Sequence, residues 1–71
     1  MTHYDFITLC MTNIPCSYEK AESMWYEEIK FSDILPGIIH PIIHIGEDKK
    51  GRYMTIHEEG HPRISTVFNI D

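Results

Sequence analysis

One segment of the chain matches a known metal-site pattern. Residues 57–61 read His-Glu-Glu-Gly-His, which fits the zinc-protease pattern H-E-x-x-H. That chemistry requires a helix, because only helical i, i+4 spacing turns both imidazoles toward one metal and leaves the glutamate as general base. Here Gly60 lies inside the pattern, Pro62 follows it, and residues 52–56 before it have strand character. We therefore interpret residues 57–61 as a turn and predict no protease site.

A second metal hypothesis rests on histidines that strand alternation brings together. If Gly46 faces Gly51 across a polar loop, His40 lies opposite His57 in the neighbouring strand. Opposed strand residues have Cβ atoms about 4.5–5.5 Å apart, which is close enough to share a divalent metal. The simpler interpretation is a solvated polar face, so we predict no cofactor. The alternative is a metal-binding domain or small metal-dependent enzyme that uses four histidines: His40, His44, His57 and His61.

No other catalytic pattern has the context it needs. Residues 17–20 read Ser-Tyr-Glu-Lys and match the S-x-x-K signature of penicillin-binding proteins, but those enzymes need further motifs and a much longer chain. Ser17 is explained as a helix N-cap. The four glycines are scattered singly, so no glycine-rich phosphate loop is present. We therefore predict a protein that is not an enzyme.

The charge of the chain disfavours direct binding to nucleic acid. Eleven acidic residues against six basic ones leave a formal charge of −5, and Lys49, Lys50 and Arg52 form the only basic cluster. No basic stripe is available to replace phosphate counterions. A third hypothesis, an acidic mimic of nucleic acid, would need carboxylates in a spaced row. The candidates are interrupted by two lysines and are Glu19, Glu22, Glu27, Glu28 and Asp33.

Length and composition bound the remaining classes. Seventy-one residues make a single domain, 1–71, of marginal stability, because so short a chain buries only about 60% of its unfolded surface. The chain has no basic leader and no long apolar run, so we expect neither secretion nor membrane insertion. Two cysteines indicate a reducing cytoplasm, although a bridge between Cys10 and Cys16 remains open. Twelve isoleucines against two leucines are compatible with a phage or accessory microbial origin.

The coarse pattern predicts a small α+β domain of β-α-β-β-β order, with one helix packed on a mostly antiparallel sheet. Residues 3–11 are rich in aromatic and β-favouring types and predict the first strand. Apolar residues at helical spacing predict a helix over residues 17–31. The last half predicts three strands that alternate, with one apolar face and one face that carries histidines. The apolar face contains Pro41, Ile43, Ile45, Met54, Ile56, Ile64, Thr66, Phe68 and Ile70, and the other face contains His40, Ile42, His44, Tyr53, Thr55, His57, Arg63, Ser65, Val67 and Asn69.

The segment of residues 37–45 carries the strongest functional indication. Pro41 cannot donate to a ladder, so this strand is expected at a sheet edge or at a bulge, yet it is apolar on both sides. Either the first strand or the helix covers it, or another protein does. We expect a small acidic regulator or inhibitor that docks on a larger protein, with a homodimer as another form of the same contact. The predicted partner-binding residues are Ile38, His40, Ile42, His44, Tyr53 and His57.

Overall fold

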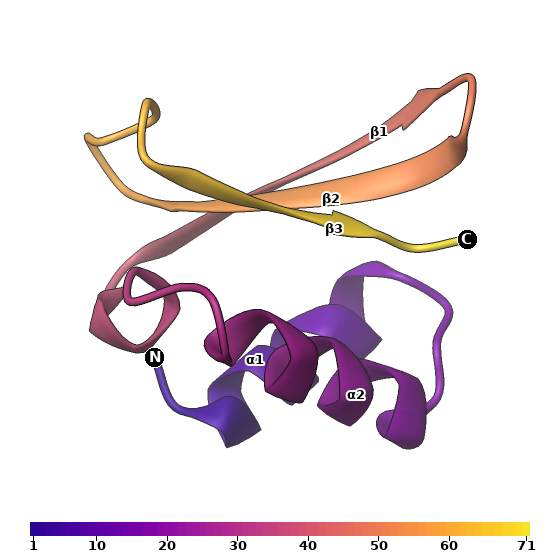
Figure 1. The fold of residues 1–71 in the computed structure, drawn as a ribbon, viewed down its shortest axis with the longest axis horizontal. Coiled ribbons are helices and arrows are strands. Elements are labelled where there is room, and N and C mark those ends of the chain that lie inside the picture. Colours follow the sequence, from indigo (N-terminus) through magenta and orange to yellow (C-terminus); the bar gives the residue numbers. More distant parts are fainter. The chain divides into compact units, whose positions relative to one another are not determined.

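Two helices precede a three-stranded antiparallel sheet in the computed structural model, which describes residues 1–71 (Figure 1). The α+β class and the antiparallel sheet are therefore as predicted. The chain divides into a helical unit, Met1–Gly37, and a sheet unit, Ile38–Asp71. The elements are α1 (His3–Asn13), α2 (Tyr18–Ile29), a short 3-10 helix η1 (Leu35–Gly37), β1 (Pro41–Asp48), β2 (Gly51–Glu58) and β3 (Ser65–Asn69).

The predicted first strand is wrong, because residues 3–13 form α1. Thr2 caps this helix: its hydroxyl accepts the Asp5 N–H at 3.1 Å, and the Asp5 carboxylate accepts the Thr2 N–H at 3.3 Å. This reciprocal pair satisfies backbone donors that the first turn would otherwise leave unpaired. Phe6, Ile7 and Cys10 are buried, which is the spacing of one helix face. The element order is thus α-α-β-β-β.

The predicted second element is confirmed as α2. The Ser17 hydroxyl accepts the Lys20 N–H at 3.1 Å, so Ser17 is the N-cap. The buried stripe consists of Ala21, Met24 and Trp25. The two helices lie side by side (Figure 1), and the Phe6 and Trp25 rings are 5.4 Å apart between centroids at 48°. Neither helix is long and apolar enough to cross a membrane.

The sheet has β2 at its centre and β1 at one edge, with Pro41 as the first residue of β1. The edge position of this proline strand is as predicted. The register differs from the prediction by two residues, because Ile42 lies opposite His57. Glu47 and Asp48 belong to the strand, and only residues 49–50 connect it to β2. The Asp48 carboxylate accepts the Lys50 N–H at 2.8 Å in this turn.

A shift of two residues leaves every residue of the three strands on the face predicted for it, whereas Ile64 lies outside the strands and is 54% exposed. The core face carries Ile43, Ile45, Met54, Ile56, Thr66 and Phe68, and the outer sheet face carries Ile42, His44, Tyr53, Thr55, His57, Ser65, Val67 and Asn69. Met54 and Ile56 on the central strand are fully buried. The core face is therefore deeply buried on β2 and β3, whereas Ile45 on the edge strand β1 is still 39% exposed.

The two cysteines are free, and they differ in environment. Cys10 is buried in α1, whereas Cys16 is partly accessible in the connection between the helices. Burial, followed by the nearby Cys16 thiol, raises the pKa of Cys10 to about 12. The Cys10 thiol therefore stays protonated near neutral pH, and the thiolate is the reactive form.

We therefore expect iodoacetamide to modify Cys16 in the native protein and to leave Cys10 unmodified. Peptide mass spectrometry after a timed reaction measures this. In urea-unfolded protein the two cysteines should react at similar rates. Equal native rates would contradict the buried position of Cys10, and a native Cys10–Cys16 disulfide would contradict the free state of both thiols.

Candidate protein-interaction face

The outer sheet face consists of three rows of side chains that run across the strands. The register pairs each β1 residue with a β2 residue and each of these with a β3 residue. The rows are Ile42–His57–Ser65, His44–Thr55–Val67 and Gly46–Tyr53–Asn69. Four of the predicted partner-binding residues, Ile42, His44, Tyr53 and His57, are thus brought together. Val67 was assigned to this face by alternation but was not among the predicted partner-binding residues.

No Asp, Glu, Lys or Arg side chain occurs in these three rows. Seventeen of the 71 residues are charged, so about two charged side chains would be expected at nine positions, and none is found. Asp48 follows at the hairpin end and gives this face a charged rim. Two apolar side chains are exposed: Ile42 by 41% and Val67 by 57%. Charge depletion inside a polar rim is the composition of protein interface cores.

Tyr53 is held in place on this face by its cross-strand partner. A Cβ atom at Gly46 would clash with the Cζ and Oη atoms of Tyr53, so the tyrosine ring lies across the glycine backbone. An aromatic side chain over a cross-strand glycine is a known way to cover exposed strand backbone. The ring is therefore ordered before any partner binds, which lowers the entropy that a contact would cost.

Some backbone N–H groups of β1, the edge strand beside this face, are not hydrogen-bonded to β2. The Glu59 N–H donates to the His40 carbonyl at 3.0 Å, which fixes the alternation of hydrogen-bonded pairs along β1. By that alternation the N–H groups of Ile43 and Ile45 point away from β2. Pro41 removes one donor only at the start of the strand. An eight-residue edge of this kind can accept an added strand.

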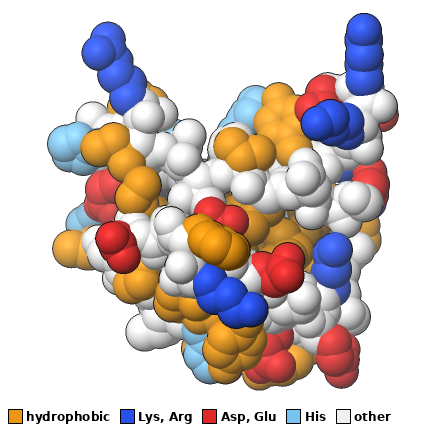
Figure 2. Space-filling view, in the orientation of Figure 1, with side chains coloured by type: hydrophobic (Ala, Val, Ile, Leu, Met, Phe, Trp, Pro, Cys, Tyr) orange, Lys and Arg blue, Asp and Glu red, His pale blue; other side chains and the backbone are white.

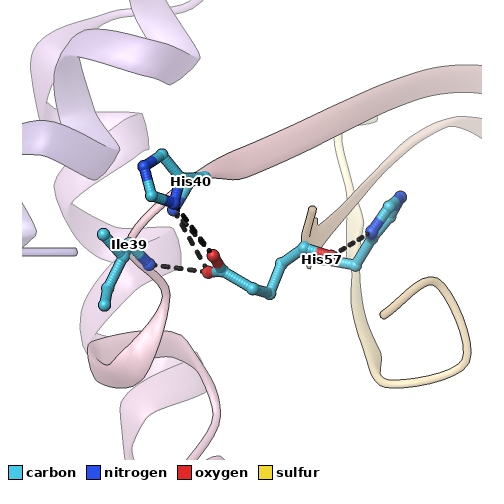
Figure 3. Close-up of polar contacts among 4 residues, drawn as sticks. Ile39, His40 and His57 are labelled. Carbon is cyan, nitrogen blue, oxygen red and sulfur yellow. Dashed lines mark hydrogen bonds and ion pairs between the residues drawn. The ribbon is translucent and has the colours of Figure 1, made fainter. Parts of the chain in front are cut away.

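Glu58 has a structural role that the sequence analysis missed. Its carboxylate accepts the Ile39 N–H at 2.7 Å and the His40 N–H at 3.0 Å, and the His40 Nδ1 lies 3.4 Å from it (Figure 3). The His57 Nδ1 is 2.9 Å from the Glu58 carbonyl oxygen. The hydrogen bonds from Ile39 and His40 to Glu58 connect the segment before β1 to the end of β2.

The histidines do not gather as the metal hypothesis requires. His40 contacts Glu58, not His57, and the two imidazoles lie apart in Figure 3. His61 lies in the loop between β2 and β3, beside a shallow hollow lined by Gly60, His61, Pro62, Arg63 and Ile64. No group of three or more His, Cys, Asp or Glu side chains is placed to hold a metal ion. The predicted His40–His57 pair is wrong because the hairpin turn is shorter than expected.

One predicted partner-binding residue lies away from the outer sheet face. Ile38 is only 2% exposed and precedes β1, so it cannot form part of the outer sheet face.

The turn interpretation of the H-E-x-x-H match is confirmed, because His57 and Glu58 end β2 and Gly60 has a φ of +83° in the turn that follows. The acids of α2 do not form a row, because Glu19, Glu22, Glu27 and Glu28 lie at widely spread angles around the helix.

A low pH should weaken the hydrogen bonds that the Glu58 carboxylate accepts from Ile39 and His40. The N–H bond from Ile39 is the largest of the effects that lower the pKa of Glu58 below its ordinary value of 4.5. A carboxyl whose pKa is lower in the folded state stabilises the fold above its unfolded pKa, and this contribution is lost as the pH falls through the folded pKa.

We expect Glu58→Gln to lower the thermal midpoint at neutral pH and to flatten its decline as the pH falls from about 5 to about 2.5. Circular dichroism melts across that range measure both effects. Glu59→Gln, an exposed neighbour, is the matched control and should follow the wild type. Identical pH profiles for Glu58→Gln and the wild type would contradict this role.

The comparisons with known proteins add no relatives. No protein-family model matches the chain, and neither the curated proteins nor the solved structures contain a significant match. A functional interpretation therefore depends on the geometry of the chain itself.

Proposed function

We propose that this protein is a non-catalytic binding module, a small acidic regulator or inhibitor that docks on a larger protein in a reducing cytoplasm. The observation that carries the proposal is the outer sheet face: three rows without a charged side chain, with Ile42 and Val67 exposed and Tyr53 fixed over Gly46. Aromatic and apolar side chains in an uncharged centre are typical of the residues that contribute most to binding.

The size of this face indicates how the partner binds. Strands about 4.8 Å apart and same-face residues about 6.8 Å apart give the three rows an area of about 300 Å². A stable interface buries about 800 Å² on each partner. The partner must therefore cover more than the outer sheet face, and the adjoining β1 edge is the natural extension, with Ile43 and Ile45 donating to an added strand.

A matched pair of lysine variants tests the proposal. Val67→Lys places a charge in the uncharged rows, whereas Phe31→Lys places the same charge at a side chain that is 87% exposed in the helical unit. Each tagged variant and the wild type is used to capture proteins from cells that produce the chain, with quantitative mass spectrometry. Equal circular dichroism melts establish that both variants are folded.

The proposal predicts a protein that the wild type and Phe31→Lys retain and that Val67→Lys loses. Retention of the same proteins by all three would contradict it. Light scattering on the purified chain distinguishes a second copy from a different partner. A wild-type dimer that Val67→Lys converts to a monomer would identify the second copy as the occupant.

A further inference from the structure

The helical unit carries a separate cluster of exposed aromatic side chains. Tyr4 on α1 is 69% exposed, and Tyr18 and Tyr26 on α2 are 45% and 52% exposed. Tyr18, Glu22 and Tyr26 follow at intervals of four residues and therefore share one side of α2. Three aromatic rings and a carboxylate are thus accessible to a ligand on the helical unit.

Contacts between side chains join His3, Glu22 and Tyr26, and electrostatic effects on Tyr18 indicate that Tyr18 and Tyr4 lie near them. The His3 ring lies 5.9 Å from the Tyr26 ring between centroids at 35°, and its Nε2 is 4.0 Å from a Glu22 carboxylate oxygen. The charge of Glu22 is the largest of the effects that raise the pKa of Tyr18, and Tyr26 and Tyr4 act on it in the same direction. We call this group, His3, Tyr4, Tyr18, Glu22 and Tyr26, the tyrosine patch.

The charge of the chain is concentrated in the unit that bears the patch. Residues 1–37 contain six acids and two lysines, a formal charge of −4, whereas residues 38–71 contain five acids and four bases, a charge of −1. Figure 2 shows acidic and hydrophobic side chains interspersed on the molecule in the region of the helices. A negative surface with exposed aromatic faces attracts cations, and phosphate-bearing ligands are repelled.

We propose that the tyrosine patch binds an arginine side chain from a basic, extended segment of a partner protein. A guanidinium group is planar and weakly hydrated, so it stacks on tyrosine faces while donating hydrogen bonds to the Glu22 carboxylate. A lysine ammonium has the same charge but cannot stack as a plane or bind a carboxylate in bidentate fashion. The arrangement therefore discriminates between two cations of equal charge.

A peptide titration tests this inference without knowledge of the natural partner. The probe is a Gly/Ser peptide that contains four arginines, and its comparison is the same peptide with four lysines. Binding is followed by NMR chemical shifts of the full-length protein. We expect the arginine peptide to shift the signals of Tyr4, Tyr18 and Tyr26 and to bind about two- to fivefold more tightly than the lysine peptide.

Two charge-matched variants distinguish the patch from general attraction. Glu22→Gln removes the central carboxylate, and Glu27→Gln removes the same charge from a different side of α2. We expect Glu22→Gln to weaken arginine-peptide binding about two- to fivefold and Glu27→Gln to weaken it by less than about twofold. Tyr26→Leu should also weaken it.

Three results would overturn the inference. The first is the absence of tyrosine shifts at millimolar arginine peptide, and the second is equal affinity for the two peptides. The third is an equal loss in Glu22→Gln and Glu27→Gln, which would show attraction by net charge alone. None of these results bears on the outer sheet face, because the variants and the probe concern the helical unit only.

Discussion

Ile7→Ala is expected to lower the free energy of unfolding by about 2–5 kcal/mol, whereas Met11→Ala should change it by no more than about 0.5 kcal/mol. Ile7 is buried in α1, and Met11, one turn later at the margin of the buried face, is 48% exposed. The loss at Ile7 combines the transfer of a buried side chain to water with the cavity that it leaves.

This pair of variants also decides between the two structures for residues 3–13. In a strand, Ile7 and Met11 would share a face and would be buried or exposed together. In α1, Met11 lies about 40° further round the helix than Ile7, at the margin of the buried stripe, so Ile7 is buried and Met11 is 48% exposed. Urea unfolding followed by circular dichroism measures both values. Equal losses would contradict α1.

Because a folded domain is stable by only about 5–15 kcal/mol, and a chain of 71 residues lies near the lower end, Ile7→Ala is expected to leave a substantial unfolded population. Phe6→Ala provides a second test at the same helix face. Its ring packs against Trp25, so its loss should be about 3–5 kcal/mol.

The second large effect concerns two adjacent residues of β2. Met54→Lys is expected to unfold the protein, because it puts an ammonium group at a fully buried position without a partner. Thr55→Lys should leave the protein folded, because its side chain points to the outer sheet face. The two variants carry the same new charge one residue apart, so only the direction of the side chain differs.

Far-ultraviolet circular dichroism and a thermal melt measure this outcome for both variants. We expect no cooperative transition for Met54→Lys and a transition close to the wild-type midpoint for Thr55→Lys. A folded Met54→Lys together with an unfolded Thr55→Lys would show that the faces are reversed.

The sequence predicted a helix over residues 17–31, where the structure has α2 (Tyr18–Ile29), and both faces of the sheet, because a cap at Ser17 and regular alternation are local signals. It failed at residues 3–13, where β-favouring side chains outweighed the opposing signals. Those signals were present: Thr2 and Asp5 form a capping box, and Phe6, Ile7, Cys10 and Ile14 have helical spacing. Capping and tertiary burial thus overrode residue propensity.

The register was not predictable from the loop composition. Two glycines, 46 and 51, suggested a six-residue polar loop, but Gly46 is a strand residue that lies beneath Tyr53. An error of two residues preserved the faces and displaced every opposed pair, which is why the outer sheet face was found and the His40–His57 pair was not. The Glu58 bonds to Ile39 and His40 span eighteen or nineteen residues and have no local signal.

Site-specific photo-crosslinking tests the docking role of the outer sheet face most directly. A benzoylphenylalanine at position 67, in the uncharged rows, is compared with one at position 27 on α2, in cells that produce the protein. We predict a discrete adduct, with a second protein or a second copy, at position 67 and none at position 27. No adduct at position 67, with the variant folded, would contradict a docking role for this face.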